Sequence, residues 1–477
     1  MAVSHDGVTW VTVGSSGGRR VAGTRDRAAA FDVVGTSSRN ARPSHNLAHY
    51  AGTVGLPAIV LVVLAVGTAK HFNGHHLWIF ALAVAALFVA RGVHLGRPVT
   101  AAHTATAAGT VLAALLIQAT GHPVIALATL ALSGLVLMWP TSSRPQPERL
   151  PSVHALVDRT VADPLAPFAM HSLKSYFFSA DQSAVIGYHT RLGVAVVGGD
   201  PIGDPAHYPA LVAQFQQFCR DRGWRIVVLG ASEHRRDLWE AAVWPPLRAV
   251  PIGRDVVVEV GSFDMVGRRF RNLRQAVSRT RNAGLTTEVI AEANLPDELA
   301  AQLREIASQT HGGQAERGFS MILDHALDGR YPGMLIVLAR DQDGVVQGFQ
   351  RYAVAGRGTE ISLDVPWRRK GAPNGIDERL SVAMIDYARD HGGKRVSLAF
   401  AAFPELFDEK DRGWLRQVMF NVIHLGDPLL ALESLYRYLK KFHSLGDRRY
   451  ALLSFRMLPI AAFALLTLEF VPHRKTD

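Results

Sequence analysis

The stretch TEISLDVPWRRKGAPNGIDERLSVAMIDYARDHGGKRVSLAF, residues 359–400, has the order strand, polar loop, helix, strand. Alternating apolar residues over Ile361–Val365 predict the first strand, and apolar residues at helical spacing predict a helix over Gly375–Asp390. Two consecutive glycines end that helix, and a second strand is predicted over Val396–Phe400. This order indicates an α/β protein.

The loop between the first strand and the helix is the candidate site. A loop that leads into a helix N-terminus directs backbone N–H groups and the positive end of the helix dipole at one point, which suits an anion or an oxyanion. The loop and its flanks carry an unusual number of charged and amide side chains: Asp364, Arg368, Arg369, Lys370, Asn374 and Asp377. We therefore expect chemistry here, and the alternative is a solvated surface loop.

Composition limits the classes of protein. A chain of 477 residues exceeds one ordinary domain. Its one cysteine, Cys219, has no partner for an internal disulfide, and neither it nor the 20 histidines show zinc-ligand spacing, so we expect a reducing compartment, no metal and no cofactor. A formal net charge of +10 favours an anionic partner, either nucleic acid or an acidic membrane. The sequence leaves the oligomeric state open.

The N-terminal third reads as a membrane anchor. Residues 1–50 are rich in Gly, Ser, Ala and Arg without apolar periodicity, which predicts a disordered basic tail with no apolar signal-peptide core. Residues 51–140 hold four apolar segments and predict four transmembrane helices. These segments are Ala51–Ala69, Phe72–Ala90, Pro98–Ala119 and Pro123–Trp139. Arginines between the second and third segments and after the fourth place both termini in the cytoplasm.

The remainder reads as two similar α/β units after a proline-rich linker over residues 141–151. Strands, a helix and a further strand occur within residues 152–262 and again over Leu335–Phe400. We therefore interpret residues 152–262 as one unit, and residues 263–477 as a basic helix followed by a second version of the same fold. Near the C-terminus, Leu458–Phe470 is apolar but too short to span a bilayer, which predicts a helix packed on the protein or lying at the membrane interface.

A basic helix is predicted over Val266–Gly284, between the two units. It carries no acidic residue and has an apolar stripe that would pack. Its arginines are Arg268, Arg269, Arg271, Arg274, Arg279 and Arg281. Because solvated helices usually mix both signs of charge, this pattern favours phosphate contact over mere solubility.

From about Lys174 onward the chain resembles the cytoplasmic domain of aminoacyl-phosphatidylglycerol synthases, the phosphatidylglycerol lysyltransferases also called multiple peptide resistance factors. The matching motifs are KSYFFS at 174–179, GGDPIGDP at 198–205, the helix at 263–284, AERGFS at 315–320, APNGID at 372–377, SLYRYLKKFH at 434–443 and RRY at 448–450. The resemblance implies tandem acetyltransferase-like folds, a membrane location and antimicrobial peptide resistance. It implies transfer of an amino acid from aminoacyl-tRNA to the glycerol hydroxyl of phosphatidylglycerol, which lowers the negative charge of the membrane.

An aminoacyl ester is already activated, so such an enzyme must hold two substrates, help remove a proton and stabilise one oxyanion. We assign Asp364 as the base or hydroxyl-orienting group and Arg368 to the lipid phosphate or oxyanion. We assign Asp377 and Asn374 to substrate binding, and Asp377 in particular to the α-ammonium group of the amino acid. The resemblance assigns Lys441 and Arg449 to the tRNA end or the lipid phosphate. The arginines assigned to tRNA are Arg268, Arg271, Arg274 and Arg281. For each residue a structural salt bridge is the alternative.

Two departures from the family pattern stand out. The family places an arginine three residues after the loop aspartate, whereas Asp364 and Arg368 are four apart. The family's membrane part is also larger and acts as a flippase, whereas four spans indicate an anchor.

The rival enzyme class is an acyl-CoA-dependent N-acyltransferase of the same fold. Its Arg/Gln-x-x-Gly-x-Gly/Ala loop needs bare backbone at the pyrophosphate, but Pro373 occupies the last small position and has no N–H group. The non-enzyme alternative is a membrane-tethered module that binds RNA or lipid. The sequence also leaves open which amino acid is moved and which lipid accepts it.

Overall fold

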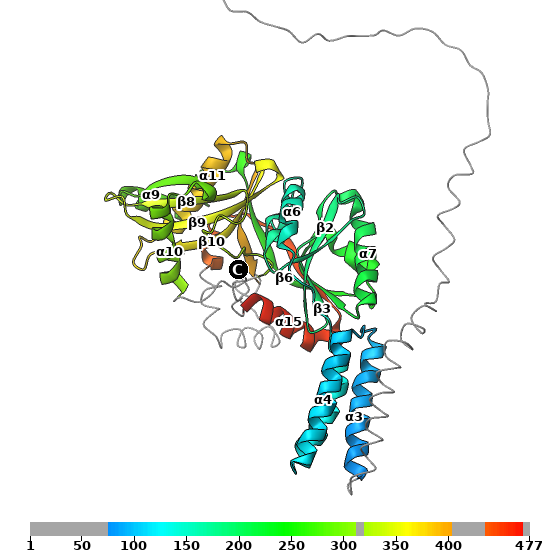
Figure 1. Cartoon of the computed structure of the whole chain (residues 1–477). Coiled ribbons are helices and arrows are strands. Elements are labelled where there is room, and N and C mark those ends of the chain that lie inside the picture. The colour runs from blue at the N-terminus through cyan, green and yellow to red at the C-terminus, as the bar shows by residue number, and fades with distance from the viewer. Residues whose placement is uncertain (1–74, 312–318, 403–434, 471–477) are drawn as a thin grey trace, which may run out of the picture. The chain divides into compact units, whose positions relative to one another are not determined.

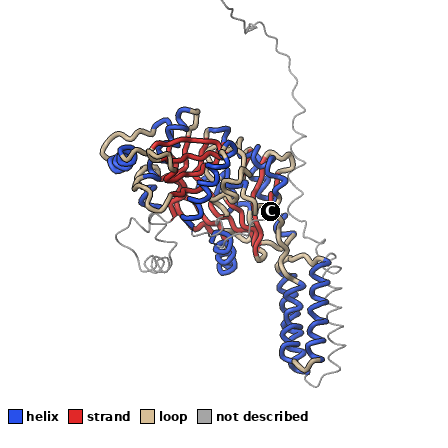
Figure 2. The backbone as a smooth tube through the Cα atoms, turned by 60° about the vertical axis from the view of Figure 1, so that its left-hand side comes forward, coloured by secondary structure: helices blue, strands red, loops and turns tan. Residues whose placement is uncertain are grey.

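The computed structural model describes residues 75–311, 319–402 and 435–470. Within them, twelve strands form a single sheet flanked by helices (Figures 1 and 2). The first half contains β1 (Ser175–Phe178), β2 (Ala184–Arg191), β3 (Val194–Gly198), β4 (Ile202–Gly203), α7 (Tyr208–Asp221), β5 (Arg225–Ser232), α8 (Arg236–Ala242) and β6 (Arg248–Glu259). The second contains α9 (Arg271–Asn282), β7 (Thr286–Ala291), α10 (Asp297–His311), β8 (Met334–Arg340), β9 (Val346–Ala355), β10 (Glu360–Arg368), α11 (Ile376–Asp390), β11 (Arg395–Ala402), β12 (Leu445–Leu453) and α15 (Leu458–Phe470).

Both halves repeat one arrangement. In the first half β1, β2 and β3 pair antiparallel, α7 follows, and β5 returns parallel to β3. In the second half β8, β9 and β10 pair antiparallel, α11 follows, and β11 returns parallel to β10. The mixed α/β sheet expected from the sequence is therefore observed.

The two halves exchange strands along the middle of the sheet. The central order is β5-β12-β6-β11. Strand β12, near the C-terminus, pairs with β5 and β6 of the first half, while β6 pairs with β11 of the second half. Each half thus completes its backbone hydrogen bonding with a strand from the other, so the halves share one sheet.

The stretch 359–400 folds in the predicted order. The helix begins after Gly375, which has a φ angle of 100°, and a Cβ atom there would lie 3.0 Å from the carbonyl oxygen of Ala276 in α9. Glycine therefore permits both the left-handed turn and the close approach of α9. Strands β10 and β11 pair at Glu360–Ser362, and beyond that point β10 follows β9 while β11 follows β6.

A β-bulge at Asp364 changes which residues face the core. Leu363 pairs with Tyr352 and Val365 pairs with Arg351, so Asp364 is the extra residue. Regular alternation would place Leu363 and Val365 on one face of the sheet. Instead Leu363 packs in the cluster beneath α9 and α11, whereas Val365 packs in the cluster beside α10.

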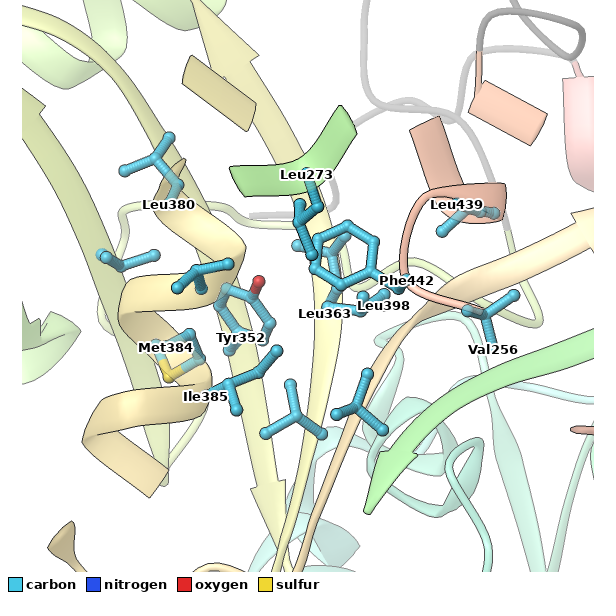
Figure 3. Close-up of a cluster of buried hydrophobic side chains, with 14 of the residues drawn as sticks. Val256, Leu273, Tyr352, Leu363, Leu380, Met384, Ile385, Leu398, Leu439 and Phe442 are labelled. Carbon is cyan, nitrogen blue, oxygen red and sulfur yellow. The ribbon is translucent and has the colours of Figure 1, made fainter. Parts of the chain in front are cut away.

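The cluster beneath α9 and α11 holds the site helices on the sheet. Figure 3 shows Leu273 of α9 beside Phe442 and Leu363, with Leu380 and Met384 of α11 in the same cluster. All five side chains are at most 3 % exposed. Truncating such a leucine to alanine costs about 2–5 kcal/mol, so the orientation of both helices is strongly determined.

The N-terminal region contains α3 (His75–His94), α4 (Ala101–Ala119) and α5 (Pro123–Leu137). Among the described residues, α3 and α4 are long and apolar enough to cross a membrane, whereas α5 is shorter. The predicted tail at 1–50 and the predicted span at 51–69 lie outside the described residues. The structure therefore shows two possible spans where the sequence predicted a four-helix anchor.

The proline-rich linker binds along the first half. The indole N–H of Trp224 donates to the carbonyl oxygen of Thr141 at 2.9 Å, and the Ser175 hydroxyl donates to that of Arg144 at 2.7 Å. The backbone N–H of Tyr176 donates to the Gln146 side chain at 2.8 Å. The linker then continues into α6 (Leu150–Val157). It is therefore packed rather than extended into solvent.

Candidate functional site

A half-open pocket of about 490 Å³ lies against the start of α11. Its walls come from α9, from the loop after β10, from the first turn of α11 and from the helical turn at residues 435–440. The lining residues are Asn272, Gln275, Ala276, Arg279, Arg368, Asn374, Gly375, Asp377, Glu378, Arg437, Tyr438 and Lys441. Segments separated by more than 160 residues thus build one site.

Candidate residues from two distant motifs meet in this pocket. Arg368 ends β10, Asn374 and Asp377 come from the loop and the start of α11, and Lys441 comes from the motif near the C-terminus. The Arg368 guanidinium donates to the Asp377 carboxylate at 3.1 Å, and Lys441 pairs with Glu378. The structure therefore brings four predicted site residues together. Three of them have an ionic partner, and Asn374 lines the pocket.

The pocket holds both signs of charge. Arg279, Arg368, Arg437 and Lys441 outnumber its two carboxylates, and the N-terminus of α11 adds a positive dipole end. Burial raises the pKa of the Asp377 carboxyl, and the charge of Arg368 opposes that rise. The site is thus suited to a ligand that carries phosphate together with an ammonium group.

A buried polar network holds the first turn of α11. The Gln350 side chain donates to the backbone oxygen of Asp377 at 3.2 Å. The hydroxyls of Tyr352 and Ser381 donate to the Gln350 amide oxygen at 2.8 and 3.0 Å, and Ser381 also contacts the hydroxyl of Tyr438 in the pocket wall. These hydrogen bonds fix the helix start relative to the sheet.

Asp364 lies outside this pocket, in a separate ionic network. Its carboxylate accepts from the Arg351 guanidinium at 2.7 Å and from the backbone N–H of Leu323 at 2.7 Å. Arg351 also pairs with Glu292 at 2.6 Å, and the side chains of all three charged residues are at most 1 % exposed. Burial raises the pKa of Asp364 to about 6, against the opposing charge of Arg351. The bulge described above turns this carboxylate toward Arg351.

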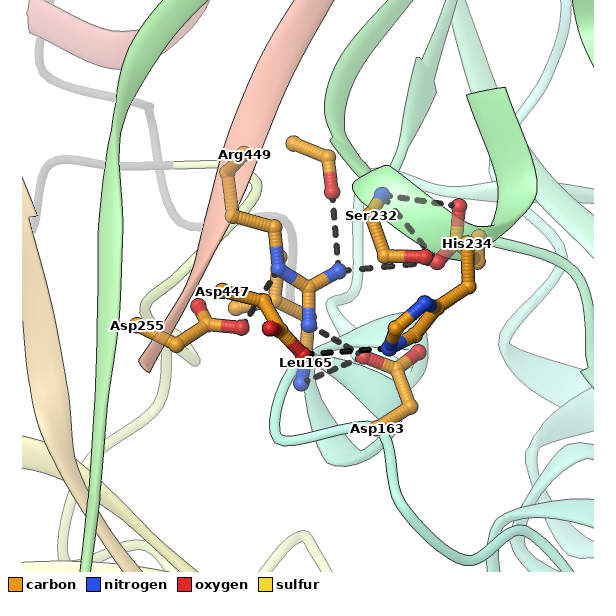
Figure 4. A network of polar contacts seen from close by, with 9 residues as sticks. Asp163, Leu165, Ser232, His234, Asp255, Asp447 and Arg449 are labelled. Carbon is orange, nitrogen blue, oxygen red and sulfur yellow. Dashed lines mark hydrogen bonds and ion pairs between the residues drawn. The ribbon is translucent and has the colours of Figure 1, made fainter. Parts of the chain in front are cut away.

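Arg449 occupies a third location, at the seam between the halves (Figure 4). Its guanidinium donates to Asp255 at 2.7 Å, to Asp163 at 2.8 Å and to the carbonyl oxygen of Gly230 at 3.0 Å, and it lies 3.5 Å from Asp200. The residue is 1 % exposed. Burial raises the pKa of Asp200 to about 6. In this structure the contacts of Arg449 are those of a structural ion network.

The basic helix divides into exposed and bound arginines. Arg268, Arg271 and Arg281 are exposed, as phosphate-binding residues must be. Arg274 donates to the carbonyl oxygens of Met265 and Gly267, so it closes the preceding loop. Arg279, which had no assigned role, lines the pocket. Within the described residues, no cluster of His, Cys, Asp and Glu has the arrangement of a metal site.

Several pocket residues were missed by sequence reasoning. Glu378 follows Asp377 directly, and Arg437 and Tyr438 lie in the motif that supplied Lys441, so motif membership was the available signal. Asn272 and Gln275 lie at helical spacing with Arg279 along α9. Their shared face could have been predicted from the helix period.

Comparison with known proteins gives a consistent result. Residues 154–453 match the family model described as phosphatidylglycerol lysyltransferase, C-terminal. The chain is 52 % identical over 451 residues to the MprF-like domain protein Rv1619 of Mycobacterium tuberculosis, covering 93 % of this chain and 92 % of that protein. It is 30 % identical over 328 residues to the lysylphosphatidylglycerol biosynthesis bifunctional protein LysX of Gordonia bronchialis, covering 66 % of this chain and 28 % of that protein. The chain thus spans about a quarter of the length of the LysX proteins it matches.

Two solved structures share the fold. The C-terminal domain of a putative lysylphosphatidylglycerol synthetase from Agrobacterium fabrum matches with a TM-score of 0.59 and 23 % identity, covering 69 % of this chain and 99 % of that chain. L-PGS from Bacillus licheniformis matches with a TM-score of 0.59 and 20 % identity, covering 69 % and 98 %. At such identities the likeness concerns the fold. Taken with the family match over residues 154–453, these findings show that the chain belongs to the phosphatidylglycerol lysyltransferase C-terminal family.

Proposed function

We propose that this protein transfers an amino acid from aminoacyl-tRNA to the glycerol hydroxyl of phosphatidylglycerol at the cytoplasmic face of the cell membrane. The lipid hydroxyl attacks the ester carbonyl, an oxyanion forms, and its collapse releases the ribose hydroxyl of the tRNA, which takes up the proton. One ester replaces another, so the balance needs no redox partner. Family membership and the mixed charge of the pocket beside α11 support this proposal.

The pocket supplies groups for the donor substrate. In the proposal Asp377, with Glu378 beside it, receives the α-ammonium of the aminoacyl group, and Asn374 donates to the same end of the tRNA. Arg279, Arg437 and Lys441 bind its phosphates, since Arg and Lys side chains favour such contacts. Arg368, whose side chain is about half exposed, then exchanges its pairing with the partly buried Asp377 for the oxyanion or the lipid phosphate, because solvent at the arginine screens the ion pair.

Asp364 stays our proposed base or orienting group. A carboxylate with a pKa near 6 is ionised at neutral pH and basic enough to assist proton removal. Its contacts with Arg351 and Leu323 equally suit a positioning role that acts through Arg351. The two roles predict different pH profiles.

We also propose that residues 51–140 form a four-helix anchor with both termini in the cytoplasm. Large apolar side chains such as Leu77, Phe80, Leu87 and Leu116 are more than half exposed on α3 and α4, as lipid-facing residues would be. A reporter fused after Asp477 should report a cytoplasmic C-terminus. Reporter activity on the outer side would contradict the proposed function, because charged tRNA is cytoplasmic.

The central experiment uses the full chain in vesicles that contain phosphatidylglycerol. Total tRNA charged with labelled amino acids is added, and the extracted lipid is analysed by mass spectrometry, which also identifies the amino acid moved. Asp377→Asn should lower kcat/KM by about tenfold or more. Asp386→Asn, an exposed position on the same helix, is the matched control and should leave activity unchanged. Absence of any aminoacylated lipid with all charged tRNAs present would contradict the proposal.

A further inference from the structure

Helix α15 is apolar around its whole circumference. In LPIAAFALLTLEF, Leu458–Phe470, Thr467 and Glu469 are the polar residues. One face, with Ala461, Ala464 and Leu468, packs in a cluster against strands β3, β5 and β12. A helix that is hydrophobic all round is normally covered on every side.

The opposite face of α15 is exposed. Ile460, Phe463 and Leu466, at three-residue spacing, are 42 %, 55 % and 56 % exposed. Leu458, the first residue of α15, and Phe455, in the preceding turn, extend this face at 47 % and 60 % exposure. Isolated exposed apolar residues are ordinary, but a contiguous row of this kind marks an interaction surface.

The threonine of the helix is compatible with an apolar neighbour. The Thr467 hydroxyl donates to the carbonyl oxygens of Phe463 and Ala464 at 2.8 and 2.9 Å, so it is satisfied within the helix. The Thr467 hydroxyl therefore keeps its hydrogen bonds when water is excluded from this face.

Three features identify the occupant as a lipid surface. The chain carries α3 and α4, which are long enough to cross a bilayer, so membrane is always near the rest of the protein. At 13 residues α15 is too short to span it, and its other face is already bound to the sheet. The chain carries a formal net charge of +10, which suits anionic headgroups.

We propose that the exposed face of α15, formed by Phe455, Leu458, Ile460, Phe463 and Leu466, docks the α/β part of the protein onto an anionic bilayer. The helix lies in the plane of the interface with this face among the headgroups and upper acyl chains. This docking rests on the proposed function in one respect, namely that the enzyme takes its acceptor from the membrane. It holds the catalytic part at the surface where that acceptor lies.

The test measures the depth of a fluorescent label in the full chain. Phe463→Cys is labelled with an environment-sensitive dye, and Val345→Cys, 42 % exposed before β9, is the matched control. Cys219 is buried at 1 %, and the unsubstituted chain reports its background labelling. The labelled chains are placed in nanodiscs, one per disc, with nitroxides at the headgroup or deep in the acyl chains.

The fluorescence emission of the label at position 463 should be blue-shifted. The headgroup nitroxide should quench it about twofold more than it quenches the label at position 345. Quenching should be stronger with phosphatidylglycerol than with phosphatidylcholine, and high salt should weaken it. Adding Leu466→Asp should reduce the quenching at 463, whereas Val345→Asp should not.

Three outcomes would overturn the proposal. Equal quenching at 463 and 345 would show no docking. A blue shift at 463 without lipid quenching would show that protein, not lipid, covers this face. Equal quenching with both lipids would exclude recognition of anionic lipid. Because quenching requires no turnover, docking without amino acid transfer would contradict the proposed function alone, and transfer without quenching would contradict the docking alone.

Discussion

Replacing Arg449 with methionine should destabilise the protein by about 3–5 kcal/mol, the usual cost of removing one partner from a buried ionic network. Methionine keeps the apolar stem but removes a guanidinium that contacts Asp163, Asp200, Asp255 and the Gly230 carbonyl oxygen. For a protein of this size about 2 °C accompanies each kcal/mol, so Tm should fall by about 6–10 °C.

The loss should depend on pH. Burial raises the pKa of Asp200 to about 6 and also raises the pKa of Asp255, while the charge of Arg449 lowers both. Without Arg449 these pKa values rise further above their unfolded values near 4. Between the unfolded and folded pKa the folded state binds more protons, so the free energy of unfolding falls as pH rises through that window. The difference in Tm between wild type and variant should therefore be larger at pH 8 than at pH 5.

The assay is thermal unfolding of the full chain, followed by tryptophan fluorescence at pH values from 5 to 8. Arg191→Met is the matched control, because Arg191 is an exposed arginine at the end of strand β2. The control should change stability by no more than about 0.5 kcal/mol. A Tm loss below about 2 °C for the Arg449 variant, or a loss independent of pH, would refute the account of this network.

Three further predictions concern activity. Asp364→Asn should lower kcat by about 100-fold with little change in KM if the carboxylate is the base, and wild-type kcat should fall as pH drops through about 6, where Asp364 becomes protonated. If kcat keeps that acid limb in the Asn variant, another group is the base. Replacing the exposed Arg268 and Arg271 with alanine should raise KM for aminoacyl-tRNA and reduce the salt slope by about two, with kcat unchanged; an unchanged KM would place the tRNA elsewhere. Acetyl-CoA should not bind measurably in calorimetry. Three backbone N–H groups near Pro373 already donate to carbonyl oxygens of the protein, and Pro373 itself has no N–H group to offer the pyrophosphate. A micromolar complex would favour the acyl-CoA class.

Local sequence patterns predicted the individual helices and strands near the site. The helix now seen as Ile376–Asp390 followed from its 3.6-residue period and the glycines that flank it. The family resemblance assigned Lys441 and Arg449 to substrate, and the structure places Lys441 in the pocket with the loop residues but Arg449 outside it. The bulge at Asp364 was not predicted, because Leu363, Val365 and Trp367 alternate in sequence as they would in a regular strand. As a result Val365 faces the opposite side of the sheet from the one that alternation implies.

The sequence by itself determined the class of fold, the order of its strands and helices, the apolar segments near the N-terminus and the motifs that point to one family, because these depend on periodicity and composition within short windows. Tertiary structure decided the rest. The insertion of β12 between β5 and β6 joins strands about 190 residues apart or more, and Arg449 finds Asp163 at a separation of 286 residues. No local pattern encodes such pairings. They arise because unpaired strand edges and uncompensated buried charges raise the free energy of the folded state. The chain therefore pairs its strands and its charges wherever folding brings complementary groups together.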